Sequence, residues 1–197
     1  MRKKVLFLTN NDNALVLYDW LLKQGEEVVK YSERLDDKIV KDIAPDIIIS
    51  YNYKYIIKQE IIDYANGAIF NLHISLLPWN RGSSPNYWSF IENTPKGVSI
   101  HQVDAGLDTG AIIAQEELFF DEGIESFSST YQKLHEKMVE LFIQNWQRLK
   151  EGTYSLNRQK GKGSFHTIKD FTMFTNGGVI DWNQNIADYK AKIKERI

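Results

Sequence analysis

The chain has 197 residues, 43% of them hydrophobic and 25% charged, which predicts a single globular domain with one sizeable core. It contains no cysteine, so disulfides, thiol nucleophiles and thiolate metal sites are excluded. With 24 Lys and Arg against 26 Asp and Glu, the formal net charge of −2 argues against a nucleic-acid partner, which usually requires a basic surface.

The first half of the chain alternates strand-like and helix-like segments. Apolar runs predict strands over residues 4–8, 26–31, 46–51 and 68–70, with helices between them over residues 13–23, 35–43 and 58–64. This alternation is typical of a Rossmann-like, doubly wound α/β fold with a mostly parallel sheet. The N-terminal apolar run is too short for a signal peptide, and no stretch approaches the roughly 20 apolar residues of a spanning helix. We therefore expect a cytoplasmic protein without a membrane partner.

The second half predicts a helix over residues 85–92, strands over 97–103 and 111–118, and a long helix over 125–150. The long helix carries apolar side chains at three- and four-residue spacing, which is typical of a core-facing stripe. The tail changes in composition, being rich in Lys, Gly and aromatic residues, and ends in a charged helix predicted over 186–197. We expect residues 1–152 to form the core of the fold and residues 153–197 to be an extension packed on it, not a separate domain.

Polar residues gather around one apolar strand near the middle of the chain. Asn71 and His73 follow the strand predicted over 68–70 and lie two residues apart, which places both side chains on the same side of an extended backbone. An amide beside an imidazole suits acyl transfer, because the amide stabilises a developing oxyanion and the imidazole moves a proton. Asp108 ends a glycine-bearing loop and is a candidate to orient His73. Spacing alone leaves open a helix cap at Asn71 and a backbone hydrogen bond at His73.

The remaining histidines are weaker catalytic candidates. A core or hydrogen-bonding role is favoured for His101 in its predicted strand, packing or exposure for His135 in the long helix, and at most a substrate contact for His166 in the tail. No two histidines have the spacing of a metal site, and the sequence has no glycine-rich dinucleotide loop, Walker loop or Gly-x-Ser-x-Gly motif, so we expect no metal. The polar turn at residues 9–12 either binds a phosphate or only caps the first helix.

A family resemblance narrows these alternatives. The motif NLHISLLP at residues 71–78, followed by DAGLDTG at residues 104–110, resembles the folate-dependent formyltransferase family. That family includes glycinamide ribonucleotide transformylase, methionyl-tRNA formyltransferase and the bacterial sugar N-formyltransferases. The resemblance is strongest over residues 68–115 and slight in the tail. Ile74 departs from the family pattern, where proline is usual, but it carries no reacting group.

Several assignments follow from the resemblance alone. It implies that residues 1–152 are a formyltransferase core, that the formyl donor is 10-formyltetrahydrofolate and that the acceptor is a primary amine. It also implies a catalytic trio. The trio comprises Asn71, His73 and Asp108. The residues implied to lie against the folate are Lys54, Tyr55, Ile56, Ser75, Leu76, Leu77, Val103, Asp104 and Leu107.

The resemblance favours a nucleotide-linked amino sugar as acceptor, for the biosynthesis of surface glycans. Aromatic side chains would meet the base or the sugar, and basic ones a pyrophosphate. The candidate acceptor contacts are Asn10, Asn11, Tyr53, Trp79, Arg81 and Phe165. The specific candidate is a UDP-linked 4-amino-4,6-dideoxy sugar of the kind used in pseudaminic-acid-type pathways.

Other interpretations stay open. Glycinamide ribonucleotide transformylases are similar in length, but their first turn is glycine-rich where this chain has TNNDN at residues 9–13. Methionyl-tRNA formyltransferases carry a further C-terminal domain and a basic face, and we expect this chain to lack both. A non-catalytic folate-binding module is a third alternative. An apolar strand edge or the aromatic tail is a candidate homodimer interface.

Overall fold

The computed structural model describes residues 1–194. Its strands are β1 (Lys4–Leu8), β2 (Glu27–Tyr31), β3 (Ile47–Tyr51), β4 (Ile69–His73), β5 (Arg81–Gly82), β6 (Lys96–Gln102), β7 (Ile112–Leu118) and β8 (Phe165–His166). Its helices are the 3-10 helix η1 (Asp12–Ala14), α1 (Leu15–Lys23), α2 (Asp37–Ile43), α3 (Gln59–Ala65), α4 (Pro85–Ile91), α5 (Phe127–Glu151), α6 (Ile168–Phe174) and α7 (Ile186–Lys192).

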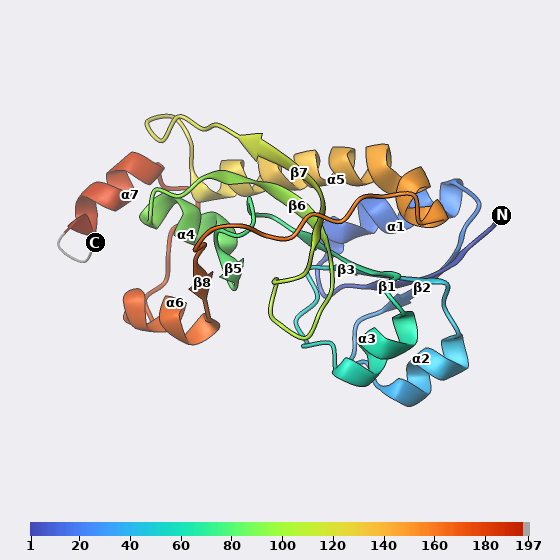
Figure 1. Ribbon diagram of the computed structural model, residues 1–197. Helices are drawn as coiled ribbons and strands as arrows, with labels where there is room; N and C mark the ends of the chain where they lie inside the picture. Colours follow the sequence, from blue (N-terminus) through green and yellow to red (C-terminus); the bar gives the residue numbers. More distant parts are fainter. Residues whose placement is uncertain (195–197) are drawn as a thin grey trace.

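Six strands form one sheet in the order β2-β1-β3-β4-β6-β7 (Figure 1). The first four pair in parallel, whereas β6 pairs antiparallel with both β4 and β7. Among the described strands of this sheet, only β6 therefore runs against the rest. The predicted Rossmann-like α/β fold with a mostly parallel sheet is confirmed.

Helices cover both faces of the sheet (Figure 1). α1 and α5 lie on one face, where Phe7 and Phe142 belong to a shared apolar core. α2 and α3 lie on the other face, where Leu6 and Val40 belong to a second core. Adjacent residues of β1 enter opposite cores because side chains alternate along a strand. This burial on both faces explains why β1 and β3 are continuous apolar runs.

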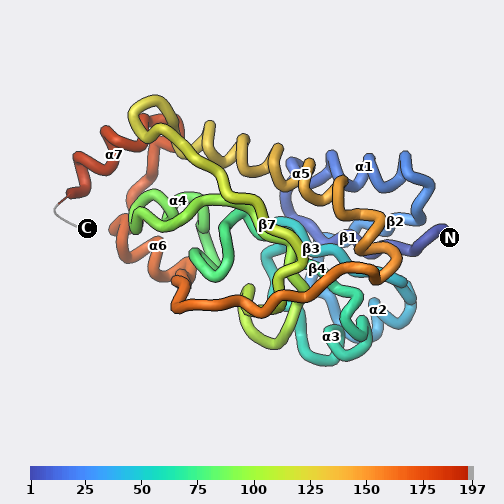
Figure 2. Tube along the Cα trace, turned by 45° about the horizontal axis from the view of Figure 1, so that its top comes forward, coloured from blue at the N-terminus to red at the C-terminus, as the bar shows by residue number. Residues whose placement is uncertain are grey.

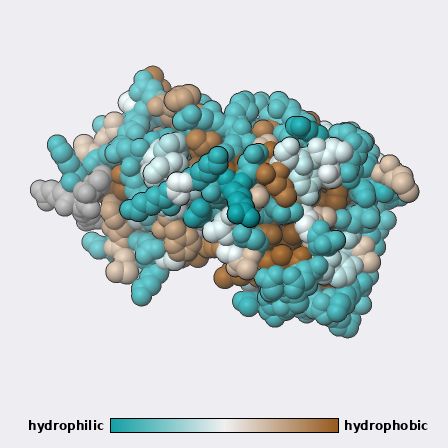
Figure 3. Space-filling model, viewed as in Figure 1, coloured by the Kyte–Doolittle hydropathy of each residue, from teal (hydrophilic) through white to brown (hydrophobic). Residues whose placement is uncertain are grey.

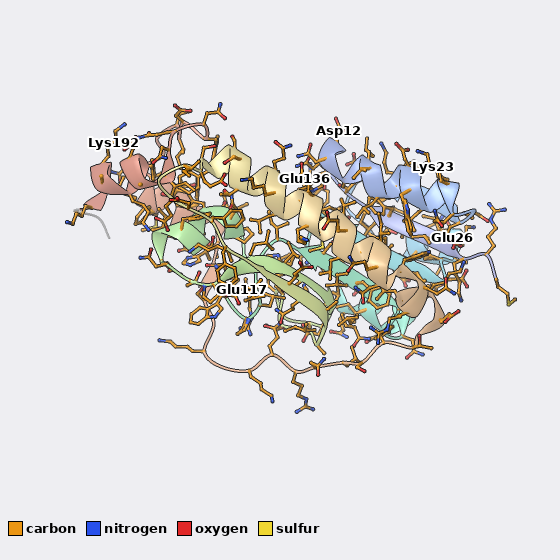
Figure 4. All side chains as sticks on the ribbon, turned by 90° about the horizontal axis from the view of Figure 1, so that it is seen from above. Asp12, Lys23, Glu26, Glu117, Glu136 and Lys192 are labelled. Atoms are coloured by element: carbon orange, nitrogen blue, oxygen red, sulfur yellow. The ribbon has the colours of Figure 1, made fainter. Side chains whose placement is uncertain are left out.

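The longest helix, α5, has a well-defined start and end. A capping box of Ser126 and Ser129 satisfies the first backbone N–H groups, and Gly152 ends the helix in the left-handed conformation. Its buried stripe faces the sheet, as the apolar spacing predicts. Figure 4 shows α5 lying beside α1, with the exposed Glu136 on α5.

The tail runs back across the molecule on the side of the edge strand β7 (Figure 2). Ile112 and Asn157 exchange backbone hydrogen bonds of 2.8 and 2.9 Å, and further along β8 pairs in parallel with β5. α6 and α7 then pack against α4 in an apolar cluster that includes Tyr87, Trp88 and Ile186. The division into a core of residues 1–152 and an extension of residues 153–197 stays a prediction.

Some elements differ from the sequence prediction. β4 continues through His73 because Asn71 and His73 pair with His101 and Ser99 on β6. The last helix, expected over 186–197, ends at Lys192, and residues 195–197 lie outside the described part. β5, β8 and α6 were not predicted, since such short segments show no periodicity. Over residues 1–194, no helix combines the length and the apolar character needed to cross a membrane.

Truncating the core face of α5 should destabilise the fold strongly. Phe142 is fully buried between α5 and the sheet, so Phe142→Ala should lower the free energy of unfolding by about 3–5 kcal/mol. The next residue, Ile143, is 37% exposed, and Ile143→Ala should cost less than about 1 kcal/mol. Urea denaturation of both variants measures the difference, and equal losses would contradict the assigned core face.

Candidate active site

The candidate site lies where β4 approaches its carboxyl end. Asn71 and His73 are both in β4, two residues apart, so both side chains leave the same face of the sheet. The His73 ring is buried, and its Nε2 lies 2.9 Å from the carbonyl oxygen of Asn80. Because a carbonyl oxygen only accepts, Nε2 carries a proton and donates it there. This hydrogen bond fixes the ring and leaves Nδ1 facing the site.

The carboxylate of Asp108 contacts the other polar groups of the site. Its Oδ1 accepts a hydrogen bond of 3.0 Å from the Asn71 amide and lies 3.4 Å from His101 Nε2. Its Oδ2 accepts a hydrogen bond of 2.8 Å from the backbone N–H of Gly82 and lies 3.6 Å from His73 Nδ1. The structure therefore brings the three predicted catalytic residues together around one buried carboxylate.

The surroundings of Asp108 keep it ionised. Burial of the carboxyl group raises its pKa, but attraction to His73 and hydrogen bonding and attraction to His101 lower it, as does the N–H of Gly82. The lowering effects prevail, so the pKa of Asp108 lies well below its usual range. A permanent negative charge is thus held against two imidazole rings.

His101 is a site residue that the sequence ranked only as a weaker catalytic candidate. It lies directly opposite Asn71 in the antiparallel pairing of β4 and β6. Its Nδ1 lies 2.8 Å from the carbonyl oxygen of Gln102, so Nδ1 donates, and Nε2 faces the Asn71 amide nitrogen at 3.2 Å. The predicted hydrogen-bonding role is confirmed, but within the site. The register of the two strands is the signal that would have identified it.

A cavity of about 1040 Å³ opens beside these residues. One wall comes from the strand ends and their loops, including Tyr53 and Leu107, and the other from α4, α5 and the tail, including Tyr87 and Trp182. Figure 3 shows apolar side chains in a notch between the lobe of α6 and the lobe of α2 and α3. Ligand sites for one small molecule are typically about 300–1,000 Å³, so this cavity suits more than one substrate group.

Most of the residues predicted to bind the cofactor line this cavity. Those in its lining are Lys54, Tyr55, Ile56, Val103, Asp104 and Leu107. The segment Ser75–Leu77 lies outside the lining: the Ser75 hydroxyl donates to the carbonyl of Trp79, and the backbone N–H of Leu77 donates to the Ser99 hydroxyl. The Leu76 side chain lies beside Gly97 of β6, where an added Cβ would be 3.1 Å from it. The folate contact of these three residues stays a prediction.

Of the residues predicted to bind the acceptor, most lie outside the cavity lining. Tyr53 lines the cavity, whereas Asn10, Asn11, Trp79, Arg81 and Phe165 lie outside its lining. The Asn10 side chain accepts from the backbone N–H of Lys54, and Asn11 caps η1 and donates to the Tyr131 hydroxyl.

Two of these residues lie in the short second sheet. The Arg81 guanidinium donates two hydrogen bonds to Gln159, and Phe165 is half-exposed beside Arg81 in the pairing of β5 and β8. Neither faces the cavity, and their acceptor contacts stay predictions.

The sequence predicted almost none of the residues in the helical wall of the cavity. Besides Tyr87, it is lined by Ser83, Ser84, Pro85, Asn86, Phe127, Ser128, Tyr131, His166, Thr167, Ile168, Lys169 and Trp182. The tail reaches the cavity because β8 pairs with β5 over only two residues, for which no sequence pattern exists. Over residues 1–194, no group of three or more His, Asp and Glu side chains is arranged to hold a metal ion.

Comparison with known proteins adds independent information. The family profile described as formyl transferase matches residues 12–145. The chain is 29% identical over 185 residues to the methionyl-tRNA formyltransferase of Clostridium tetani (strain Massachusetts / E88), a match covering 93% of this chain and 56% of that protein. The chain thus spans only about half the length of this curated relative.

Solved structures show the same fold over more of their own length. The formyltransferase PseJ from Anoxybacillus kamchatkensis, in complex with UDP-4,6-dideoxy-4-formamido-L-AltNAc and tetrahydrofolate, superposes with a TM-score of 0.86 and 38% identity, covering 93% of this chain and 96% of that one. A 4-N formyltransferase from Francisella tularensis superposes with a TM-score of 0.78 and 22% identity, covering 93% of this chain and 85% of that one. At that identity, the second match shows the fold alone.

Acid should destabilise the wild-type chain more than Asp108→Asn. An unfolded Asp titrates near pH ~3.9, and the native Asp108 has a lower pKa, so the unfolded chain binds more protons in this range. The stabilisation is present above about pH 4 and is lost as the pH falls, by at most about 1.4 kcal/mol per pH unit. Thermal unfolding at pH 5, 4 and 3 measures this, and parallel losses in the two proteins would contradict the lowered pKa.

Proposed function

Because the chain belongs to the formyl transferase family, we propose that it moves a formyl group from 10-formyltetrahydrofolate to the primary amine of a nucleotide-linked amino sugar. The observation that carries this proposal is the convergence of the Asn71 amide, the His73 imidazole and the Asp108 carboxylate beside a cavity of about 1040 Å³. This combination supports acyl transfer, because it offers donors to a developing oxyanion and a group that moves a proton.

The three side chains would have different roles. The donor supplies an electrophilic formyl carbon, to which the amine nitrogen bonds as the bond from that carbon to the folate nitrogen breaks. His73, in its protonated form, and Asn71 would stabilise the negative charge that develops on the formyl oxygen. Asp108 would hold the ring of His73 and stabilise its positive charge. The proton lost by the amine ends on the leaving nitrogen of the folate.

The position of Asn71 places one requirement on this mechanism. Its amide nitrogen has two protons and lies 3.0 Å from Asp108 Oδ1 and 3.2 Å from His101 Nε2, which accepts only when the His101 ring is neutral. With a neutral His101 ring, Asn71 must release one of these partners to stabilise the formyl oxygen. His101 is the weaker one, at 3.2 Å against 3.0 Å for the charged carboxylate, so we expect the contact with His101 to be released.

The strand-end wall of the cavity suits the folate. Ile56 and Leu107 are apolar yet 79% and 46% exposed, and both line the cavity. Covering such side chains with a flat ring removes apolar surface from water, which favours binding. The loop that contains Val103 and Asp104 adds backbone polar groups beside them. The donor would therefore lie against this wall, with its formyl group toward His73.

The helical wall suits a nucleotide-linked sugar. The hydroxyl-bearing residues Ser83 and Ser128 line it, together with the charged Lys169 and the aromatic Trp182. Hydroxyls match sugar hydroxyls, a lysine matches phosphate, and an indole matches a planar base. Similarity to PseJ over nearly the whole of both chains supports a UDP-linked 4-amino-4,6-dideoxy sugar as the specific acceptor. Formylation of such a sugar would serve surface-glycan biosynthesis.

Two other acceptors are tested alongside. Methionyl-tRNA is an alternative because the curated relative from Clostridium tetani is named for it, although the chain covers 56% of that protein and carries a net charge of −2. Phosphoribosylglycinamide is the other. The loop after β1 has no glycine. Its Asn10 and Asn11 side chains are hydrogen-bonded to Lys54 and Tyr131, so these contacts already use groups that a phosphate would need.

Mixing the chain with 10-formyltetrahydrofolate and each acceptor should release tetrahydrofolate only with a nucleotide-linked amino sugar. The panel contains UDP- and dTDP-linked 4-amino-4,6-dideoxy sugars, phosphoribosylglycinamide and methionyl-tRNA. Absorbance follows the release, and mass spectrometry detects a gain of one formyl group on the acceptor. Release with one of the other two acceptors would replace the proposed substrate, and release with none would favour a folate-binding module.

Removing either oxyanion donor should nearly abolish turnover. His73→Ala and Asn71→Ala should each lower kcat by about 100-fold or more, because each loses stabilisation of the developing charge. His135 lies outside the cavity lining, and His135→Asn should keep kcat within roughly threefold of wild type. Near wild-type turnover in either of the first two variants would contradict the proposed roles.

A further inference from the structure

We propose that Gln159, held by Arg81, is a positioning residue that sets the place of Asp108 for catalysis. This inference rests on the proposed function, but one of its tests below does not require turnover. Gln159 belongs to the part of the tail that runs past the start of β7, between α5 and α6 (Figure 2). It was not among the candidate residues of the sequence, and it lies outside the cavity lining.

The side-chain amide of Gln159 is fully used within the protein. Its Nε2 donates to the carbonyl oxygens of Asp108 at 2.7 Å and Gly110 at 2.9 Å. Its Oε1 accepts from Arg81 Nε at 3.0 Å and from Arg81 Nη2 at 2.7 Å. A primary amide offers two protons and two lone pairs, so all four are engaged. Such complete use fixes the orientation of the amide.

These contacts close a ring around Asp108. The backbone of Asp108 is held by Gln159, Gln159 is held by Arg81, and the next residue, Gly82, donates its N–H to the Asp108 carboxylate. Asp108 is thus held at its backbone by Gln159 of the tail and at its side chain by Gly82 of β5. Displacement of Gln159 would weaken both contacts, because Gln159 also binds Arg81, the residue before Gly82.

The backbone of Asp108 needs such support. Its φ of 54° lies in the left-handed region, which is unfavourable for a residue other than glycine. Conformations of this kind persist only when the surroundings hold them. The two hydrogen bonds from Gln159 straddle Thr109 and hold the chain immediately after Asp108. They supply the constraint that keeps the carboxylate at Asn71, His73 and His101.

The segment carrying Gln159 is itself anchored at both ends. Asn157 exchanges two backbone hydrogen bonds with Ile112, and Ser164 both donates to the carbonyl of Pro78 and accepts from the N–H of Arg81. Arg81 therefore contacts the tail twice, through its backbone and through its guanidinium. This arrangement gives Arg81 a structural role within the protein, and its predicted acceptor contact stays a prediction.

Kinetics test the proposal with matched variants. Gln159→Ala should lower kcat by on the order of 10-fold, with KM for 10-formyltetrahydrofolate and for the UDP-linked 4-amino-4,6-dideoxy sugar nearly unchanged. Gln159→Glu keeps the size and the partner for Arg81 but sets a carboxylate against two carbonyl oxygens, so it should be at least as impaired. The exposed neighbour Arg158 provides the control, and Arg158→Ala should match wild type.

A double-mutant cycle separates positioning from general destabilisation. If Gln159 acts through Asp108, Gln159→Ala should lower kcat by less than about twofold in an Asp108→Ala background. The same fold-loss in both backgrounds, a change in KM alone, or no effect in the wild-type background would each overturn the proposal.

Nitrogen NMR of the histidine rings provides a test without substrates. Gln159→Ala should shift the ring signals of His73 and His101, which contact Asp108, and leave those of His135, which contacts Tyr51 and Asn13. Unchanged signals from His73 and His101 would overturn the proposal even if the variant lost activity. If no acceptor is formylated but these signals shift, the proposed function fails and the positioning role stands.

Discussion

The buried carboxylate of Asp108 is the interaction on which the site depends. It accepts hydrogen bonds from the Asn71 amide and the Gly82 backbone, and it lies within 3.6 Å of nitrogen atoms of two histidine rings. These partners come from three separate parts of the chain, in β4, β5 and β6. A buried charge is stable only when it is paired and hydrogen-bonded, so the carboxylate and its partners hold one another in place.

The fold supplies this arrangement through strand register. β4 and β6 run antiparallel, and their pairing sets His101 opposite Asn71, so the loop after β6 returns Asp108 to the same edge. Gly110 allows that return, since a Cβ there would lie 1.7 Å from the carbonyl oxygen of Gln102. The loop after the parallel strand β3 lines the same strand-end wall of the cavity. An antiparallel strand in an otherwise parallel sheet thus brings the imidazole and the carboxylate to β4.

The sequence predicted the features that are local or periodic. The strands and helices of the sheet follow from apolar runs and caps, and Asn71 and His73 follow from spacing on one strand. Asp108 came from a motif, and the structure brings it to the other two.

Features that depend on long-range pairing were not predicted. His101 enters the site only through register, and the helical wall enters through a two-residue pairing of β5 with β8 that has no pattern in the sequence. The contact of Arg81 with Gln159 joins residues 78 positions apart and likewise has no pattern in the sequence.

A crystal structure of the chain with tetrahydrofolate and a formylated UDP-linked amino sugar tests the central claim most directly. The account predicts that the formamide oxygen lies within about 3.2 Å of the Asn71 amide nitrogen and of His73 Nδ1, the ring nitrogen that faces the site, with the Asp108 carboxylate still beside the ring. A formamide group bound beyond hydrogen-bonding reach of both side chains, with its carbon elsewhere in the cavity, would contradict the account.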